Sequence, residues 1–564
     1  MNRRVSISSI LKGMILLFFL IFLFVPIGQI VWRALTVEGT FSVTNLMQTL
    51  VNEKWGRAFQ NSVLYSAAGA LLATGLSFIL AYGMNFTNIP KKYLNKLTTI
   101  LLLPMLLPTI TYGFVLLYSF GKQGLWTRIF GHEFFSIYGA TGVIMGFVLY
   151  TLPVTFILLN HSMHYLDKRF LLVSRLMQDG WLQRLWVTIL QPMRKILIIA
   201  FLQAFFMAFT DFGIPTALGG QTTFITTLLY EGFMGAIPNF QQGSVIALTM
   251  LIPSIISIIL LNYLQKKEHF DSPKEVRMKT NQWRDWLFGV LLTGTTALIF
   301  CLFLVMFVIP FVSEWPYELQ FTLAHIKRFL TEQTLVMTLR NSLFVASMTA
   351  IFGTIIAYVS GLLVARAPRQ TRMTRFLDSF ATITNSVPGM VLGVAYLLIF
   401  SGGILHNTST ILVILTVIHY FGTPYQMAKD ALLKLNPNWE NTAKIMGDRW
   451  IDTVIRVLIP NSLHTIVELF TYYFTNAMVT ISGVIFLTSA RTILITVKIK
   501  ELQHFGKFTD IFILSLLLLF INSIVLLISS KIKRRIGLNE KAKKHHRWRI
   551  YFGKYVIFER LRGK

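Results

Sequence analysis

The sequence has little cysteine and little acidic charge, and both shortages narrow the class of protein. Its 564 residues contain one cysteine, Cys301, which excludes a disulfide framework, a thiolate zinc site and an iron–sulfur site. Only 13% of the residues are charged, with 24 acidic against 52 basic side chains, whereas an ordinary globular chain has about a quarter charged residues. Because 54% of the residues are hydrophobic, the composition fits a membrane protein with its positive charge on one side, and not a nucleic-acid binder.

Catalytic motifs are missing too. The chain has no G-x-x-x-x-G-K-[ST] phosphate loop, so any ATP hydrolysis must come from a partner. It has no H-E-x-x-H metal motif, no histidine and acid at metal-binding spacing, and no G-x-S-x-G nucleophile elbow. We therefore expect no catalytic residues, no metal and no cofactor.

Long apolar runs are abundant. A helix needs roughly 20 mostly apolar residues to cross a bilayer, because backbone polar groups cannot stay unpaired in lipid. About twelve such runs lie near residues 13–34, 62–84, 98–120, 136–160, 196–217, 245–264, 287–312, 342–365, 379–401, 408–428, 460–486 and 511–530. The sequence thus predicts an all-α polytopic membrane protein with about twelve transmembrane helices.

Basic residues indicate which side of the membrane is cytoplasmic. Twelve spans put both termini on one side, together with the basic loops at 85–96 and 366–375 and the tail from Lys531. By the positive-inside rule this side is cytoplasmic. The tail (531–564) directly follows a span, so we interpret it as an anionic-lipid anchor in preference to an RNA-binding run.

An internal repeat divides the chain. Motifs recur in the same order in both parts: Asn61-Ser62 and Asn341-Ser342, Pro108 and Pro388, Pro153 and Pro424, Met177-Gln178-Asp179 and Met446-Gly447-Asp448, and Asp211 and Asn476. Each half crosses the membrane six times in the same orientation, so the repeat is parallel. We expect a first half (1–264), a cytoplasmic linker (265–286), a second half (287–530) and the basic tail (531–564).

Each half also has one amphipathic cytoplasmic segment that is too short to span. In the second half (436–460), Asn436-Pro437 is typical of a helix start, and Gly447 is suited to end that helix in the left-handed conformation. Asp448 is placed to cap a second short helix that leads to Pro460.

The first-half counterpart (167–192) passes Met177, Asp179 and Gly180 and reaches Pro192. A helix that ends at glycine and re-enters the bilayer at proline is rigid along its length and hinged at both ends, so it can pass a push to the adjoining spans. An interfacial helix lying on the headgroups is the alternative.

The run from Glu440 to Asp448, followed by Ile455-Arg-Val-Leu-Ile-Pro460, resembles the EAA loop of type I permease subunits of binding-protein-dependent ABC importers. Asn441 and Thr442 replace the usual glutamate and first alanine, and the first-half copy departs further from the pattern. The resemblance covers nearly the whole chain and is strongest to fused two-domain permeases of ferric-iron, thiamine and 2-aminoethylphosphonate importers.

The resemblance implies a set of partners. Two ABC ATPase subunits would hold the loops on the cytoplasmic side, and an extracellular or periplasmic binding protein would deliver the solute to the outer face. Glu440 or Asp448 would pair with basic residues of the ATPase. The implied ATPase-coupling residues are Met177, Asp179, Gly180, Pro192, Glu440, Ala443, Gly447, Asp448 and Pro460. The implied location is the inner membrane of a prokaryote.

Polar and kinking residues within the spans are candidates for the translocation path. A carboxylate in lipid costs a few kcal/mol, so Asp211 should face the bundle interior or a cavity, either lining the path or anchoring helices. For its repeat partner Asn476 an anchoring role is favoured. Pro108 and Pro388 can kink spans that open and close, although simple packing explains them equally well.

We therefore expect a permease of an ATP-driven importer for a small solute, with ferric iron or 2-aminoethylphosphonate favoured over thiamine. The alternative is a secondary transporter driven by an ion gradient, which predicts buried charged pairs and needs no cytoplasmic loops. A lipid-modifying membrane enzyme would need a catalytic cluster at one membrane face, which the sequence does not display.

Overall fold

The computed structural model describes residues 7–37, 39–265, 281–367 and 371–562, and most of these residues are helical. The predicted all-α class is confirmed: in the described ranges the strands form only two short antiparallel hairpins, β1 (Thr36–Val37) with β2 (Thr40–Phe41) and β3 (Val312–Glu314) with β4 (Glu318–Phe321). Most of the predicted linker, residues 266–280, lies outside the described residues, as do the side chains of the tail beyond residue 537.

The helices of the first half follow in chain order as α1 (Ile7–Phe19), η1 (Leu20–Phe24), α2 (Val25–Ala34), α3 (Thr44–Val51), α4 (Glu53–Phe86), α5 (Lys91–Leu101), η2 (Leu103–Leu106), α6 (Thr109–Phe120), α7 (Leu125–Phe130), α8 (Ala140–His164), α9 (Arg169–Leu176), α10 (Trp181–Leu185), η3 (Trp186–Leu190), α11 (Gln191–Phe209), α12 (Gly213–Leu218), α13 (Ile225–Met234) and α14 (Phe240–Gln265).

The helices of the second half are α15 (Gln282–Val308), η4 (Ile309–Phe311), α16 (Ala324–Thr331), α17 (Gln333–Ala365), α18 (Arg372–Ser386), α19 (Gly389–Phe400), α20 (Ser409–His419), α21 (Gly422–Leu433), α22 (Asn438–Ile445), α23 (Trp450–Thr453), η5 (Val454–Leu458), α24 (Ile459–Asn461), α25 (Leu463–Val479), η6 (Val484–Phe486), α26 (Ile495–His504) and α27 (Phe508–Arg562).

Eight helices in the described ranges are long and apolar enough to cross a membrane on their own. Three further candidate spans are bent helix pairs: α18 with α19, bent by 103°, α20 with α21, bent by 55°, and the helix Trp450–Asn461 with α25, bent by 77°. The run near 98–120 is divided among α5, η2 and α6, with Pro104 in η2 and Pro108 directly before α6. The missing backbone N–H and fixed φ of proline explain why the chain breaks there.

The two halves exchange their first spans. The span α1–α2 packs against α17, α18 and α19 of the second half, and Phe19 lies with its ring centroid 4.5 Å from that of Phe421. Reciprocally, α15 packs against α4, α5 and α6 of the first half, where the Tyr93 and Thr293 hydroxyls lie 2.7 Å apart. Hydrophobic packing between the halves therefore involves both first spans, in addition to the central helices.

The recurring Asn-Ser motif makes equivalent hydrogen bonds in both halves. Ser62 on α4 accepts from the backbone N–H of Ile225, at the start of α13, over 2.8 Å. Ser342 on α17 accepts from the N–H of Ile495, at the start of α26, over the same distance. Each serine thus satisfies an unpaired N–H at the first turn of a short helix, which accounts for its recurrence.

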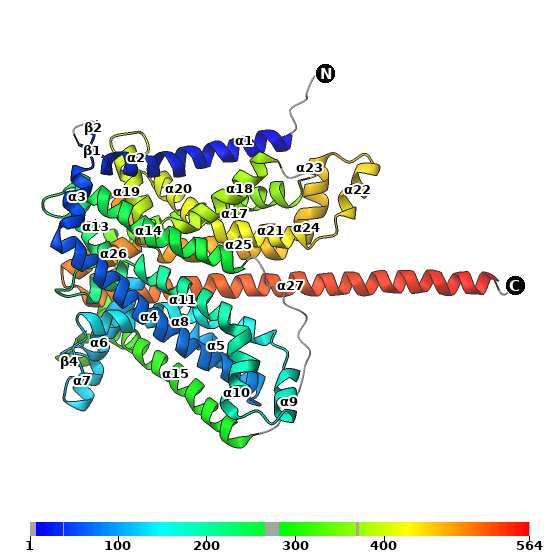
Figure 1. The fold of residues 1–564 in the computed structure, drawn as a ribbon, viewed down its shortest axis with the longest axis horizontal. Helices are drawn as coiled ribbons and strands as arrows, with labels where there is room; N and C mark the ends of the chain where they lie inside the picture. The colour runs from blue at the N-terminus through cyan, green and yellow to red at the C-terminus, as the bar shows by residue number, and fades with distance from the viewer. Residues whose placement is uncertain (1–6, 38, 266–280, 368–370, 563–564) are drawn as a thin grey trace.

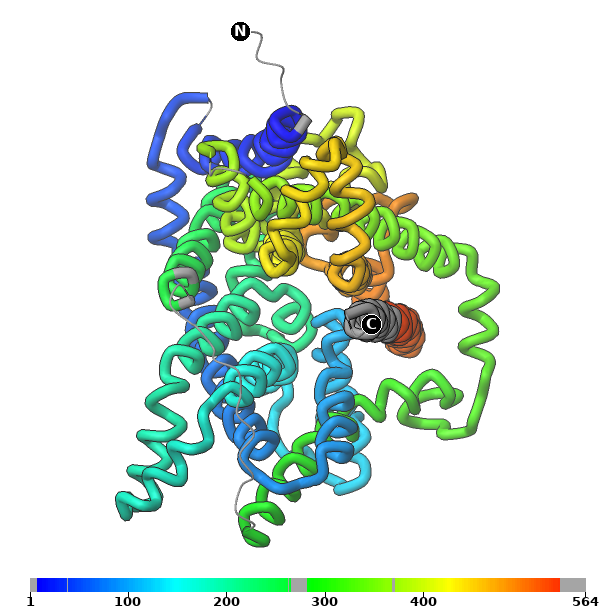
Figure 2. Tube along the Cα trace, turned by 90° about the vertical axis from the view of Figure 1, so that its right-hand side faces the viewer, coloured from blue at the N-terminus to red at the C-terminus, as the bar shows by residue number. Residues whose placement is uncertain are grey.

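The predicted amphipathic loops lie at one end of the molecule. Figure 1 shows α9 and α10 at the same end as α22 and α23, where α1 also begins and α27 extends outward. The hairpins and the short helices α3, α7 and α13 lie at the opposite end. Viewed along the bundle, the two loops lie on different sides of α27 (Figure 2). We call the two ends the loop end and the hairpin end.

Candidate functional site

The second-half loop folds as a short helix closed by a left-handed turn. The side chain of Asn436 accepts from the N–H of Asn438 over 2.9 Å, so α22 begins one residue later than the sequence pattern indicates. At its end Gly447 has a φ of +86°. The N–H of Asp448 donates to Ala443 over 3.0 Å, and that of Gly447 donates to Lys444 over 3.2 Å. These two bonds form a Schellman motif, which ends α22 and reverses the chain.

Asp448 does not cap the following helix, contrary to the sequence-based expectation. The residue before α23 is Arg449, and its side chain makes no capping bond. The backbone of Asp448 is used in the turn instead, and its side chain is exposed.

The first-half loop builds the same turn without glycine. Gln178 has a φ of +58°, and the N–H of Asp179 donates to Ser174 over 3.1 Å. Gly180, expected to be the glycine of this loop, has a φ of −58° and precedes α10. Gln178, and not Gly180, therefore holds the position equivalent to Gly447, and a coupling role for Gly180 stays a prediction. The Met-x-Asp repeat already aligns those two residues and is the signal that identifies the turn.

Buried small residues support both turns. Ala443 and Ser174 hold the same position in their helices and are both buried. In the first loop the Ser174 hydroxyl donates to the Asp179 carboxylate over 2.7 Å. Alanine has no hydroxyl, so the second turn lacks this bond. The second turn instead has a glycine at its left-handed position, where a residue without a side chain is not strained.

A basic side chain connects each loop to the loop end of a long helix. In the second half this side chain follows the long helix, and in the first half it belongs to the loop. In the second half Arg366, which follows α17, donates to the carbonyl of Leu435 over 2.9 Å and lies 3.5 Å from the Glu440 carboxylate. In the first half the cation is on the loop: Lys168 donates to the carbonyl of Asn85, near the end of α4, over 2.7 Å.

Glu440 therefore has a partner within the chain, whereas the sequence-based expectation paired it with the ATPase. The Arg366 side chain is 6% exposed and that of Glu440 is 28% exposed. Burial raises the pKa of the Glu440 carboxyl above its ordinary value, and the Arg366 charge acts in the opposite direction.

The two loops re-enter the bundle differently. Both pass through one π-helical turn, η3 or η5, directly before the proline segment. In the first half, α10, η3 and α11 form one continuous helix through Pro192, so no hinge exists at that proline. In the second half the chain bends by 77° at Ser462, two residues after Pro460. The Ser462 hydroxyl lies 2.7 Å from the hydroxyl of Tyr358, which places the bend against α17.

Matched apolar pairs project from the ends of the two loop helices. Leu176 and Met177 are 84% and 73% exposed, and Ile445 and Met446 are 87% and 76% exposed. Such large apolar side chains in solvent, next to a rigid turn, are typical of a surface that another protein covers. Of these four, the sequence-based site included only Met177; the repeat of an aliphatic residue before methionine is the signal for the others.

The path candidates lie inside the bundle. Asp211, between α11 and α12, accepts from the N–H of Ile214 over 2.8 Å and from the side chain of Thr109 at the start of α6. Its carboxylate thus joins two helices. Asn476 donates to the carbonyl of Tyr472, one turn earlier in α25. Pro108 and Pro388 directly precede α6 and α19.

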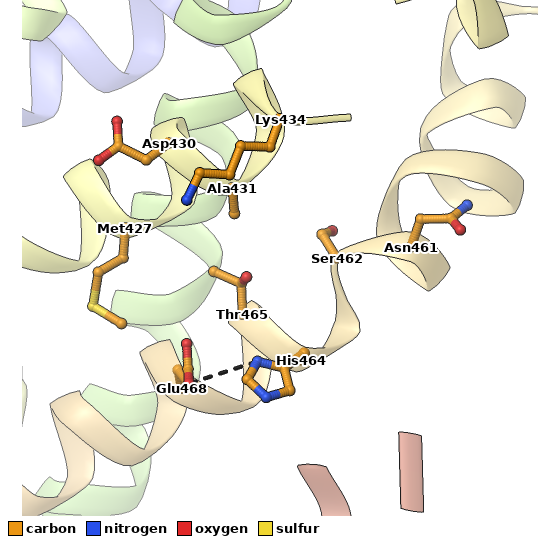
Figure 3. A pocket seen from close by; sticks show the side chains of 9 residues that line it. All are labelled: Met427, Asp430, Ala431, Lys434, Asn461, Ser462, His464, Thr465 and Glu468. Atoms are coloured by element: carbon orange, nitrogen blue, oxygen red, sulfur yellow. Dashed lines mark ion pairs between the residues drawn. The ribbon is translucent and has the colours of Figure 1, made fainter. Parts of the chain in front are cut away.

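A cavity of about 390 Å³ adjoins the second hinge. Figure 3 shows His464 and Glu468 facing each other across one turn of α25, with 3.6 Å between Nδ1 and Oε1. Lys533 of α27 approaches the same carboxylate to 3.2 Å. The lining residues are Met427, Asp430, Ala431, Lys434, Asn461, Ser462, His464, Thr465 and Glu468. In the described ranges, no three His, Cys, Asp or Glu residues gather as a metal site.

The chain is similar to known transport permeases. Residues 353–537 match the family described as binding-protein-dependent transport system inner membrane component. The chain is 25% identical over 511 residues to a putative ferric transport system permease protein of Haemophilus influenzae, covering 86% of this chain and 78% of the relative. It is 23% identical over 523 residues to a ferric transport system permease protein of Actinobacillus pleuropneumoniae, covering 89% and 74%.

A shorter match is to a permease that is named for another cargo. Over 148 residues the chain is 25% identical to a molybdate/tungstate transport system permease protein of Pyrococcus furiosus, covering 26% of this chain and 57% of the relative. Residues 353–537, which include α22, Gly447 and the second hinge, therefore match the inner membrane component of binding-protein-dependent transport systems, and the chain as a whole is similar to ferric transport permeases over most of its length.

Proposed function

We propose that this chain forms the membrane pathway of an ABC importer that carries ferric iron. The main observation in support is the pair of loops at one end of the bundle. Each loop is closed by the same turn and presents an exposed apolar pair. The ferric transport function for which the two long relatives are named supports ferric iron as the cargo. A phosphonate such as 2-aminoethylphosphonate is the second candidate, and thiamine the third.

In this proposal two ATPase subunits bind the loop end, one at each loop. The Leu176–Met177 pair would enter a groove of one ATPase, and the Ile445–Met446 pair would enter the same groove of the other. The two halves (1–264 and 287–530) would form one pathway between them. The loop end would be cytoplasmic in the inner membrane, and a binding protein would dock at the hairpin end, where the segments around 35–61, 218–244 and 313–340 lie.

The test is uptake of radiolabelled ferric iron by proteoliposomes that contain the chain, its ATPase and its binding protein. We expect uptake that requires ATP and is insensitive to a proton uncoupler, with no uptake of labelled thiamine. Uptake of 2-aminoethylphosphonate in place of iron would identify the phosphonate as the cargo and leave the proposed ATP-driven mechanism unchanged. Uptake that persists without ATP and stops with the uncoupler would establish a secondary transporter instead.

A matched pair of variants tests the docking surface. Replacement of Ile445 and Met446 by aspartate should abolish co-purification of the ATPase. The control is Ile404→Asp, which changes a 99% exposed apolar residue between α19 and α20, away from the loops. Equal ATPase recovery from both variants would contradict the assignment of the loops as the docking surface.

A further inference from the structure

The cavity at the second hinge lies between two helices of the second half. Asp430 and Lys434 line it from α21, and Thr465 and Glu468 line it from α25, which packs against α21. Figure 3 shows Lys434 and Glu468 on opposite walls, with Thr465 between them. The cavity adjoins Ser462, where the chain bends by 77°. A ligand in this cavity would therefore contact the helices on both sides of the hinge.

Apolar side chains occupy the corresponding positions of the first half. Counted from the recurring prolines of the two halves, the counterparts of Lys434 and Glu468 are Met163 and Ala200. Both are fully buried and belong to one hydrophobic cluster. Charged side chains at these positions are therefore particular to the half that bends, and packing of the repeat does not require them.

Two hydrogen-bond donors reach the cavity without a partner. The ammonium group of Lys434 and the hydroxyl of Thr465 both line it, and neither has a hydrogen-bond partner among the side chains and backbone groups that the structure describes. Lysine and hydroxyl side chains are common ligands of phosphate oxygens. These two donors are therefore suited to a phosphate group.

The Glu468 carboxylate has one oxygen left for a donor. Lys533 of α27 lies 3.2 Å from Oε1, and His464 Nδ1 lies 3.6 Å from the same atom. Oε2 has no partner within the described part of the chain. An ionised carboxylate accepts hydrogen bonds at both oxygens, so Oε2 is suited to an ammonium group of a ligand.

The charges around the cavity are balanced. Lys434 and Lys533 are basic, whereas Asp430 and Glu468 are acidic. Gln426 donates to the Asp430 carboxylate over 3.1 Å, which partly satisfies that group from its own helix. A surrounding with both signs of charge favours a ligand that carries both signs over a simple anion.

The cavity lies at the level where a membrane span ends. Lys533 is close to the end of the candidate span Phe508–Gly537, and lysine at a span end places its charge among lipid headgroups. Leu526, two turns deeper on the same face of α27, is exposed. Charged residues thus adjoin the cavity at the headgroup level, with an exposed apolar side chain below them.

We propose that this cavity binds a phosphate that carries a primary ammonium group, supplied as the headgroup of phosphatidylethanolamine. The phosphate accepts hydrogen bonds from Lys434 and Thr465, and the ammonium group donates to Glu468. The bound headgroup connects α21 to α25 and so opposes any change of the bend at Ser462. This site does not depend on which cargo the chain carries.

The test is native mass spectrometry of the purified full-length chain in detergent, titrated with three lipids that have identical dioleoyl chains. Phosphatidylethanolamine should bind about tenfold more tightly than phosphatidylglycerol, which has no ammonium group. It should exceed phosphatidylcholine by a similar factor, because a quaternary ammonium group has no N–H to donate. A charge-assisted hydrogen bond accounts for differences of this size.

Two variants separate the two parts of the headgroup. Lys434→Gln should weaken binding of both phosphatidylethanolamine and phosphatidylglycerol by about tenfold, because both contain the phosphate. Glu468→Gln should remove the preference for phosphatidylethanolamine and leave phosphatidylglycerol at least as tightly bound. The matched control is Lys444→Gln, which removes the charge of an exposed lysine on α22, outside the cavity, and should leave lipid binding unchanged.

Equal binding of the three lipids by the wild-type chain would overturn the site, as would unchanged binding by Lys434→Gln. A loss of binding in Lys444→Gln as large as that in Lys434→Gln would also overturn it. Soluble O-phosphoethanolamine tests the source of the headgroup. Displacement of the lipid by this compound at a similar concentration would support the headgroup chemistry and overturn phosphatidylethanolamine as its source.

Discussion

The two loops at the loop end fold alike and are held differently. Both end in a Schellman turn with an exposed apolar pair, yet one turn uses Gly447 and the other uses Gln178. The second loop is followed by a 77° bend, whereas the first continues into its span as a straight helix. The comparison shows that the turn is duplicated, while the way in which the chain re-enters the bundle is not. We expect motion to enter the second half through a hinge and the first half through a rigid helix.

The largest expected effect tests the shared feature. Leu176→Asp with Met177→Asp, and separately Ile445→Asp with Met446→Asp, should each weaken ATPase binding by about 30-fold, because a charge placed in an apolar interface costs about 2 kcal/mol. Surface plasmon resonance with the purified ATPase would measure this. If only one pair matters, the two loops are not equivalent docking surfaces.

The next effect tests the difference in anchoring. Arg366→Met leaves the half-buried Glu440 without its partner and should lower the free energy of unfolding by about 2 kcal/mol. Lys168→Met should cost less than about 1 kcal/mol, because Lys168 binds a neutral carbonyl and its loss leaves no buried carboxylate without a partner. Thermal unfolding of the two variants in detergent measures both effects. The reverse order would show that the first loop is the more firmly held.

Exchange of the turn residues should give opposite signs. A non-glycine residue in the left-handed region costs about 1 kcal/mol, so Gln178→Gly should stabilise the first turn and Gly447→Gln should destabilise the second. A Cβ at residue 447 meets no atom within 4 Å, so the cost there comes from the backbone alone. Limited proteolysis of each loop reports the change. The same sign for both exchanges would contradict the equivalence of the two turns.

The smallest effect concerns pH. Because burial raises the pKa of the Glu440 carboxyl, the folded chain holds this proton more tightly than the unfolded chain does. This group therefore favours folding as the pH falls through the raised pKa, and opposes folding above it. Glu440→Gln should remove a small gain in melting temperature between neutral pH and about pH 4.3, the ordinary value for glutamate. An unchanged pH profile in the variant would contradict the assignment.

The all-α class and the rough position of most spans follow from the sequence, because long apolar runs have few alternatives in a membrane. The turn at Gly447 follows as well, since glycine is the usual residue at φ +86°. The turn at Gln178 does not follow from residue type, because glutamine is uncommon in the left-handed region, and only its alignment with Gly447 in the Met-x-Asp repeat indicates it. The Arg366–Glu440 contact joins residues 74 positions apart, and only the packed structure brings them together.

The exchange of first spans has a consequence for how the protein is made. The surfaces that α17, α18 and α19 offer to α1–α2 are complete only when the first half is present, and α4 to α6 need α15 in the same way. A half produced alone would lack the span that the other half contributes, and the helix surfaces that this span covers would face lipid. The smallest unit that can assemble fully is therefore the pair of halves, and not either repeat by itself.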